Sequence, residues 1–273
     1  MPNTSRSLAA LALMAGALAA CSDSTSVSTG TLTVRLTDAP VDYVQSAVVW
    51  ISKVYLIGGG DTTGAKFTIT STAAQYDLLS LQNGVTAALG TATIPVGSYS
   101  QMRFVVDSAR ITLKAPLTFP GGSASKILTV PSGQQTGVKV NFATPVSIVP
   151  GETILVADFD VSRSFVFTGA VGSPTGALFK PVLHATVKNV AASIAGTVTP
   201  ANSRAQLFAI STTSTDTVST TLADSVTGVY KFRFIPPGSY TVTAVGTAVG
   251  STLNASKAIT LRAAQDTTGV NFP

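Results

Sequence analysis

Four aspartates are the residues of this chain best suited to acid–base or metal chemistry. Asp158 and Asp160 stand two positions apart, so on one strand their side chains share a face while Phe159 points to the other. Paired carboxylates can transfer protons, or they can bind Ca²⁺ through their oxygens. Asp38 and Asp42 could add oxygen ligands if their segment lies nearby.

The presence of these aspartates can also be explained by a structural role, with no acid–base or metal-binding function. Asp38 could cap the turn that Pro40 begins, and Asp158 and Asp160 could pair with Arg163 or accept backbone hydrogen bonds. We prefer this interpretation. The sequence therefore predicts no metal site and no cofactor, and these aspartates stay weak calcium candidates.

The only histidine, His184, has no evident catalytic partners. A Ser-His-Asp triad needs a histidine held between a nucleophile and an acid. His184 alternates with apolar residues in the stretch 181–187, which predicts a strand position pointing outward from the core. No Gly-x-Ser-x-Gly motif is present. We therefore expect no enzyme, and a hydrolase using Asp158 and Asp160 is the most remote alternative.

The only cysteine, Cys21, follows the first apolar run of the chain. Arg6 supplies a positive start, residues 8–20 are uncharged, and the last three of them are Leu-Ala-Ala. The stretch is too short for a bilayer core of about 30 Å, which needs roughly 20 apolar residues. Leu18-Ala19-Ala20-Cys21 resembles the lipobox of bacterial lipoproteins.

That resemblance implies diacylglycerol on the Cys21 sulfur, cleavage before Cys21 and acylation of the new amine by a chain such as palmitate. Residues 1–20 would be a lipoprotein signal peptide and residues 21–29 a lipidated tether. Ser22 after the cysteine favours the outer membrane over the inner one. An ordinary secretory signal with an incidental cysteine is the alternative.

Composition indicates an all-β protein. Charged residues make up only 11% of the chain, and Thr, Ser, Val, Ala and Gly dominate. The net charge of +5 comes from 17 basic and 12 acidic residues spread along the chain. Since no basic run is present, we expect no nucleic-acid partner.

Alternating polar and apolar residues predict the strands of a first β-sandwich over residues 30–190. One helical segment is expected, at Tyr76–Leu89. Strands are expected at 31–36, 44–57, 67–70, 101–113, 126–130, 137–142, 153–159 and 178–187.

A second β-sandwich is predicted over residues 191–273. It repeats a turn of the first: Ile94–Tyr99 (IPVGSY) recurs as Ile235–Tyr240 (IPPGSY). Proline fixes φ, glycine accepts unusual backbone angles, and the tyrosine begins a strand with its ring inward. Residues 136–142 likewise recur in shorter form as residues 268–272. The repeats suggest related topologies for the two sandwiches.

Both halves resemble known families. The second, with its Ile-x-Gly-x-Val opening at 194–198, Gly-x-Tyr-x-Phe at 228–232 and Pro-Pro-Gly-x-Tyr-x-Val at 236–242, resembles the carboxypeptidase regulatory-like family. This implies a prealbumin-type, Greek-key sandwich that serves as a stalk, spacer or occasional glycan-binding module. The first, with Leu36–Pro40 (LTDAP) and Asp158–Ser164 (DFDVSRS), resembles a bacterial lipoprotein domain of unknown function.

These observations together predict a non-catalytic, lipid-anchored protein of the bacterial cell envelope that acts as a structural or binding module. Its partners would be the membrane, through the anchor, and a glycan or an envelope protein. The alternative is a carbohydrate-binding surface lipoprotein, for which Trp50, Tyr43 and Tyr55 could form a stacking platform. Trp50 and Tyr55 differ by five positions, so a regular strand would turn them to opposite faces.

Overall fold

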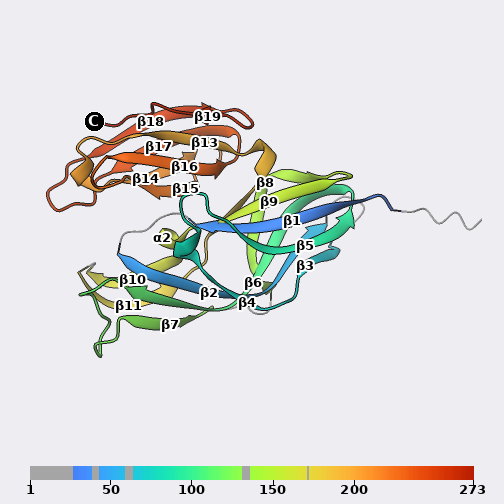
Figure 1. Cartoon of the computed structure of the whole chain (residues 1–273), viewed down its shortest axis with the longest axis horizontal. Helices are drawn as coiled ribbons and strands as arrows, with labels where there is room; N and C mark the ends of the chain where they lie inside the picture. The colour runs from blue at the N-terminus through green and yellow to red at the C-terminus, as the bar shows by residue number, and fades with distance from the viewer. Residues whose placement is uncertain (1–26, 39–42, 59–63, 131–135, 171) are drawn as a thin grey trace, which may run out of the picture.

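The chain folds into several β-sheets with little helix, which confirms the predicted all-β class (Figure 1). The structure, a computed structural model, describes residues 27–38, 43–58, 64–130, 136–170 and 172–273. Two separate hydrophobic cores lie in this part of the chain. One is built from residues between Leu32 and Leu183 and the other from residues between Ala192 and Phe272. We call the parts around them the first unit, up to residue 190, and the second unit, from residue 191.

The described residues of the first unit form twelve strands. They are β1 (Thr29–Asp38), β2 (Val44–Gly58), β3 (Lys66–Thr70), β4 (Ala74–Asp77), β5 (Ala87–Pro95), β6 (Gly97–Leu113), β7 (Ser125–Thr129), β8 (Val138–Ile148), β9 (Glu152–Phe159), β10 (Phe165–Ala170), β11 (Ser173–Phe179) and β12 (Leu183–Val187). Its short helices are η2 (Leu78–Leu81), α2 (Val161–Ser164) and η3 (Lys188–Val190). No helix in the described ranges is long and apolar enough to cross a membrane.

Two sheets enclose the first core. One has the strand order β12-β9-β1-β5, in which β1 and β9 run parallel. The other has the order β3-β2-β6-β7, with β4 added to β2 and β8 added to β6. Along β1, Leu32, Val34 and Leu36 are fully buried and alternate with half-buried residues, as expected for a strand with one face on a core. A separate hairpin joins β10 to β11.

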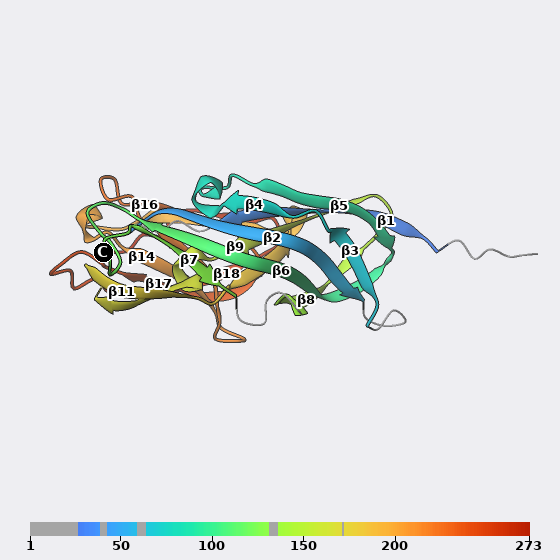
Figure 2. The same ribbon diagram turned by 90° about the horizontal axis from the view of Figure 1, so that it is seen from below.

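Seven strands make up the second unit, which lies beside one end of the first (Figures 1 and 2). They are β13 (Ala192–Thr197), β14 (Gln206–Ser211), β15 (Thr217–Leu222), β16 (Val229–Ile235), β17 (Gly238–Val245), β18 (Asn254–Leu261) and β19 (Asp266–Thr267). The helix η4 (Ala201–Ser203) follows β13. The sheets are ordered β16-β13-β19 and β15-β14-β17-β18.

The repeated turn has the same local structure in both units. The Tyr99 hydroxyl donates a hydrogen bond to the Pro95 carbonyl (2.8 Å), and the Tyr240 hydroxyl donates to the Pro236 carbonyl (2.7 Å). Each tyrosine ring is buried, so each hydroxyl fixes the turn four residues before it. The second repeat differs: residues 138–141 pair antiparallel with β6, whereas Phe272 forms a parallel bridge with Val198.

Two elements differ from the sequence prediction. The helical segment expected over residues 76–89 is wrong: it contains the end of β4, the single turn η2 and the start of β5. Asp77 caps η2 by accepting a hydrogen bond from the Leu79 amide, and only Leu78 and Leu81 bury their side chains in that turn. The strand expected over residues 178–187 is divided between β11 and β12, with Pro181 between them.

Candidate functional site

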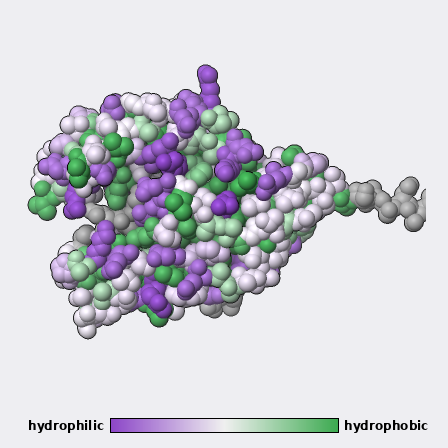
Figure 3. Space-filling view, viewed as in Figure 1, coloured by the Kyte–Doolittle hydropathy of each residue, from purple (hydrophilic) through white to green (hydrophobic). Residues whose placement is uncertain are grey.

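Buried polar side chains gather where the first unit meets the second. Because β1 and β9 are parallel, their carboxyl ends meet at one edge, where Thr37 is paired with Asp158 in the ladder and Asp38 lies next to them. The strands β15 and β16 of the second unit cover this edge. Hydrophilic side chains also gather on the surface above this junction (Figure 3).

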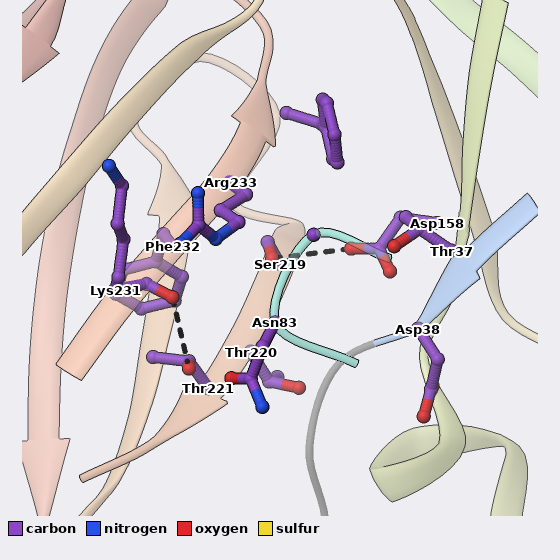
Figure 4. A pocket seen from close by; sticks show the side chains of 12 residues that line it. Thr37, Asp38, Asn83, Asp158, Ser219, Thr220, Thr221, Lys231, Phe232 and Arg233 are labelled. Carbon is purple, nitrogen blue, oxygen red and sulfur yellow. Dashed lines mark hydrogen bonds between the residues drawn. The ribbon is translucent and has the colours of Figure 1, made fainter. Parts of the chain in front are cut away.

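Asp158 connects the two units directly. The Ser219 hydroxyl, from β15, donates a hydrogen bond to Asp158 Oδ2 (3.3 Å), as Figure 4 shows. The second oxygen, Oδ1, has no hydrogen-bond partner among the described residues. Burial raises the pKa of Asp158 to about 7, and the charge of Asp160 acts in the same direction.

Asp38 is held by backbone and amide donors of the first unit. Its Oδ1 accepts a hydrogen bond from the Val161 amide (3.2 Å), and its Oδ2 accepts one from Gln82 Nε2 (3.5 Å). Burial raises the pKa of Asp38 well above its ordinary value, and the nearby Asp158 carboxylate raises it further. Two neighbouring carboxyl groups therefore both resist ionisation.

Asp160 organises the short helix α2 rather than continuing β9. Its Oδ1 accepts hydrogen bonds from the Arg163 amide (3.1 Å) and the Ser162 hydroxyl (2.7 Å), as an N-cap residue does. The helix in turn contacts β15. The Ser162 and Thr220 hydroxyls lie 3.2 Å apart, and the Arg163 guanidinium donates to the Thr217 carbonyl (2.6 Å).

His184 lies in β12 directly opposite Asp158 in the β9 ladder. It is half-buried, and its Nε2 has no hydrogen-bond partner among the described residues. Burial lowers its pKa and the Arg163 guanidinium adds to this, while the Asp160 charge and a hydrogen bond with the Thr217 backbone oppose both. The imidazole is thus biased toward the neutral form.

The junction leaves little open space. A crevice of about 30 Å³ lies between Asp38 and Asp158 on one side and β15 and β16 on the other (Figure 4). A single water molecule needs about 10–15 Å³ measured in this way. The crevice is therefore of a size that suits water molecules.

The structure brings Asp38, Asp158 and Asp160 close together, but the prediction that Asp158 and Asp160 share a strand face is wrong, because β9 ends at Phe159 and Asp160 caps α2. Among the described residues, no group of histidines, cysteines and acids has an arrangement that could hold a metal ion. The other two predicted residues, Asp42 and Cys21, lie outside the described residues. The sequence prediction missed Ser219 and Thr220, since they come from the second unit and carry no motif.

The three aromatic residues considered for sugar stacking do not form a platform. Tyr55 is buried, and the Tyr43 ring packs edge-on against Phe167. Trp50 is half-buried beneath the Arg110 guanidinium, 5.1 Å from the ring centre. Each ring is therefore buried by, or in contact with, other residues of the protein.

A larger pocket lies at one end of the second unit, away from the cluster. Its volume is about 420 Å³, and it lies between the β13–β14 loop and the β17–β18 loop. The Thr247 and Ala248 amides both donate to the Ser203 carbonyl (3.0 Å each), so the two loops hold each other in place. The side chains that line it include Pro200, Asn202 and Thr252, and none of the lining side chains is charged.

Comparisons with known proteins place the chain in a family. No curated protein matches it. The solved structure titled "The Bacillus anthracis TIE protein" aligns with 88% of this chain at 11% identity and a TM-score of 0.25, too low to support an argument. The chain spans about a third (33%) of that structure's length. The family described as "Domain of unknown function (DUF4382)" matches residues 29–181, more than half of the 273 residues. The chain therefore belongs to this family of domains of unknown function.

Proposed function

We propose that this protein is a lipid-anchored, non-catalytic structural or binding module of the bacterial cell envelope. The anchor is a diacylglycerol thioether on Cys21, and residues 22–28 are the tether, one residue shorter than the sequence predicts because β1 begins at Thr29. A single myristoyl chain holds a protein to a membrane only marginally, whereas two or three chains hold it stably. Ser22 after the cysteine favours the outer membrane.

The filled junction between the units is the observation that supports a non-catalytic role best. Acid–base chemistry needs a carboxyl group beside a space that admits a substrate. Asp158 instead accepts the Ser219 hydroxyl, and Asp160 caps α2. The neighbouring crevice of about 30 Å³ has room only for water. The burial of Asp158 and Asp160, and the raised pKa of Asp158, thus follow from the packing of the two units against each other.

The second unit acts in this proposal as a carboxypeptidase regulatory-like spacer. Its seven strands in two sheets suit a prealbumin-type sandwich. The matching Pro-Pro-Gly-x-Tyr segment forms the turn before β17, where Tyr240 fixes the Pro236 carbonyl. These residues serve the core and the turn, so they support a scaffold role.

Cell fractionation of a C21S variant tests the anchor. We expect the unaltered protein in the membrane fraction and labelled by an alkyne analogue of palmitate, because Cys21 carries the acyl chains. The C21S variant should lose the label and membrane attachment. A matched C21S/S24C variant keeps one cysteine but moves it out of the lipobox, and it should also stay unlabelled. Full labelling of either variant contradicts the proposal.

Carbohydrate binding is the second candidate, and the pocket in the second unit favours it. A volume of about 420 Å³ lies in the range of small-molecule sites, and the uncharged hydroxyl, amide and apolar lining suits a neutral sugar. A screen of neutral and acidic oligosaccharides by thermal shift tests this. Neutral sugars should raise the melting temperature, and N202L should remove that shift. No shift with any neutral sugar rules the candidate out.

A further inference from the structure

Three exposed valines gather at the narrow end of the first unit, where the chain enters β1. Val27 is 68%, Val96 38% and Val149 53% exposed. They come from the segment before β1, the β5–β6 turn and the β8–β9 turn, and we call them the apolar tip. Figures 1 and 2 show β1 beginning at this end, where Figure 3 shows the described surface narrowing, and the second unit towards the other end.

Backbone contacts hold the three segments side by side. The Val96 amide donates to the Ser28 carbonyl (2.8 Å), next to Val27. On the other side, the Thr31 amide donates to the Gly151 carbonyl (2.8 Å). At Gly30 an added Cβ would lie 2.2 Å from the Val149 carbonyl oxygen, so β1 runs tightly against the β8–β9 turn. The three segments that carry the valines are therefore adjacent.

The fold does not need these valines for its core. Ile94 and Ile148, which precede the two turns, are already buried at 2% and 1% exposure. Single exposed apolar residues are ordinary, and a group of them at one end of a molecule is one feature of surfaces that meet something apolar. Glu152 is the acidic residue beside the tip, and its carboxylate accepts a hydrogen bond from the Thr33 hydroxyl (3.0 Å), up the strand from the tip.

We propose that the apolar tip sits in the headgroup region of the membrane to which Cys21 is attached, so that the first unit stands end-on to the bilayer. This rests on the lipid anchor proposed above. Six residue steps separate Cys21 from Val27, at most about 21 Å of extended chain. The anchor therefore holds the tip, rather than any other face, next to the lipid. The strands β7 and β11, which carry the exposed Ile127 and Leu178, lie towards the opposite end (Figures 1 and 2).

Tryptophan fluorescence in vesicles tests this orientation. The chain from Cys21 onward, with Trp50→Phe to remove the native signal, is coupled through Cys21 to a maleimide lipid in phosphatidylethanolamine–phosphatidylglycerol vesicles. V96W and V149W place reporters in the tip, and I127W places the matched control at the far end. Brominated lipids quench tryptophans that lie in the membrane. Circular dichroism and thermal melting confirm that each variant is folded.

We expect brominated lipids to reduce the fluorescence of V96W and V149W by about two-fold or more, because interfacial groups insert roughly 5–10 Å. The I127W signal should stay unchanged. If neither tip variant is quenched, or if I127W is quenched as strongly, the proposed orientation is wrong. Because the lipid is attached chemically, this result is independent of whether cells acylate Cys21, which the C21S experiment decides.

Discussion

Replacing Asp158 with Asn should make the protein more stable above pH 7 and flatten its dependence on pH. Burial raises the pKa of Asp158 from 3.8 to about 7, so between about pH 4 and 7 the folded protein holds a proton that the unfolded chain has lost. Unfolding free energy therefore falls as pH rises through this window, by at most roughly 4 kcal/mol. D158N removes the charge and keeps an oxygen to accept the Ser219 hydroxyl.

Urea unfolding from pH 4 to pH 8 measures this effect. The variant and the unaltered protein should have similar stability near pH 4, and D158N should gain roughly 2–4 kcal/mol at pH 8. A smaller slope should persist in D158N, since the buried Asp38 also has a raised pKa. The control, K188Q, removes a charge from an exposed side chain that does not titrate in this pH range and should keep the original slope. Equal stability of D158N and the unaltered protein at pH 8 contradicts the burial of this carboxylate.

A methyl group at Gly30 should destabilise the first unit severely. An added Cβ would lie 2.2 Å from the Val149 carbonyl oxygen and 3.0 Å from a methyl carbon of Ile148. The β8–β9 turn must then move, which breaks the hydrogen bond from the Thr31 amide to the Gly151 carbonyl. Overpacking at buried positions costs about 1–3 kcal/mol, and the lost backbone bond adds about 1 kcal/mol.

Thermal and urea unfolding of G30A, compared with G97A, test this close approach. Gly97 lies at the same end of the molecule, and its nearest neighbour to an added Cβ is a Tyr99 ring carbon at 3.9 Å. G97A should change the unfolding free energy by less than about 0.5 kcal/mol, whereas we expect G30A to lower it by roughly 3 kcal/mol. Comparable stability of the two variants would falsify the packing of β1 against the turn.

Strands could be predicted where burial alternates along the sequence, and they were missed where it does not. β1, β2, β6 and β9 follow the predicted ranges, because each faces a core on one side. β15 and β18 lack this alternation: their sequences, TVSTTL and NASKAITL, are mostly polar or small. The prediction of a helix at 76–89 was wrong. Leu78 and Leu81 have helical spacing, but Asp77 and the strands on both sides limit it to one turn.

The acidic cluster could be predicted only in part. The sequence singled out Asp38, Asp158 and Asp160, and parallel pairing of β1 with β9 brings the first two together. The prediction that Asp158 and Asp160 share one strand missed the end of β9 at Phe159. Ser219 lies 61 residues from Asp158 along the chain, in the other unit, and no local sequence pattern predicts such a contact. The residues that meet at the junction between the two units could therefore be identified only from the three-dimensional structure.

Mass spectrometry of the N-terminal peptide from the protein purified out of its native membrane tests the lipid anchor most directly. We expect a chain that begins at Cys21, with a diacylglycerol on its sulfur and a fatty acyl group on its amine. A free Cys21 thiol, or cleavage at a different residue, would contradict the anchor and with it the end-on orientation of the first unit.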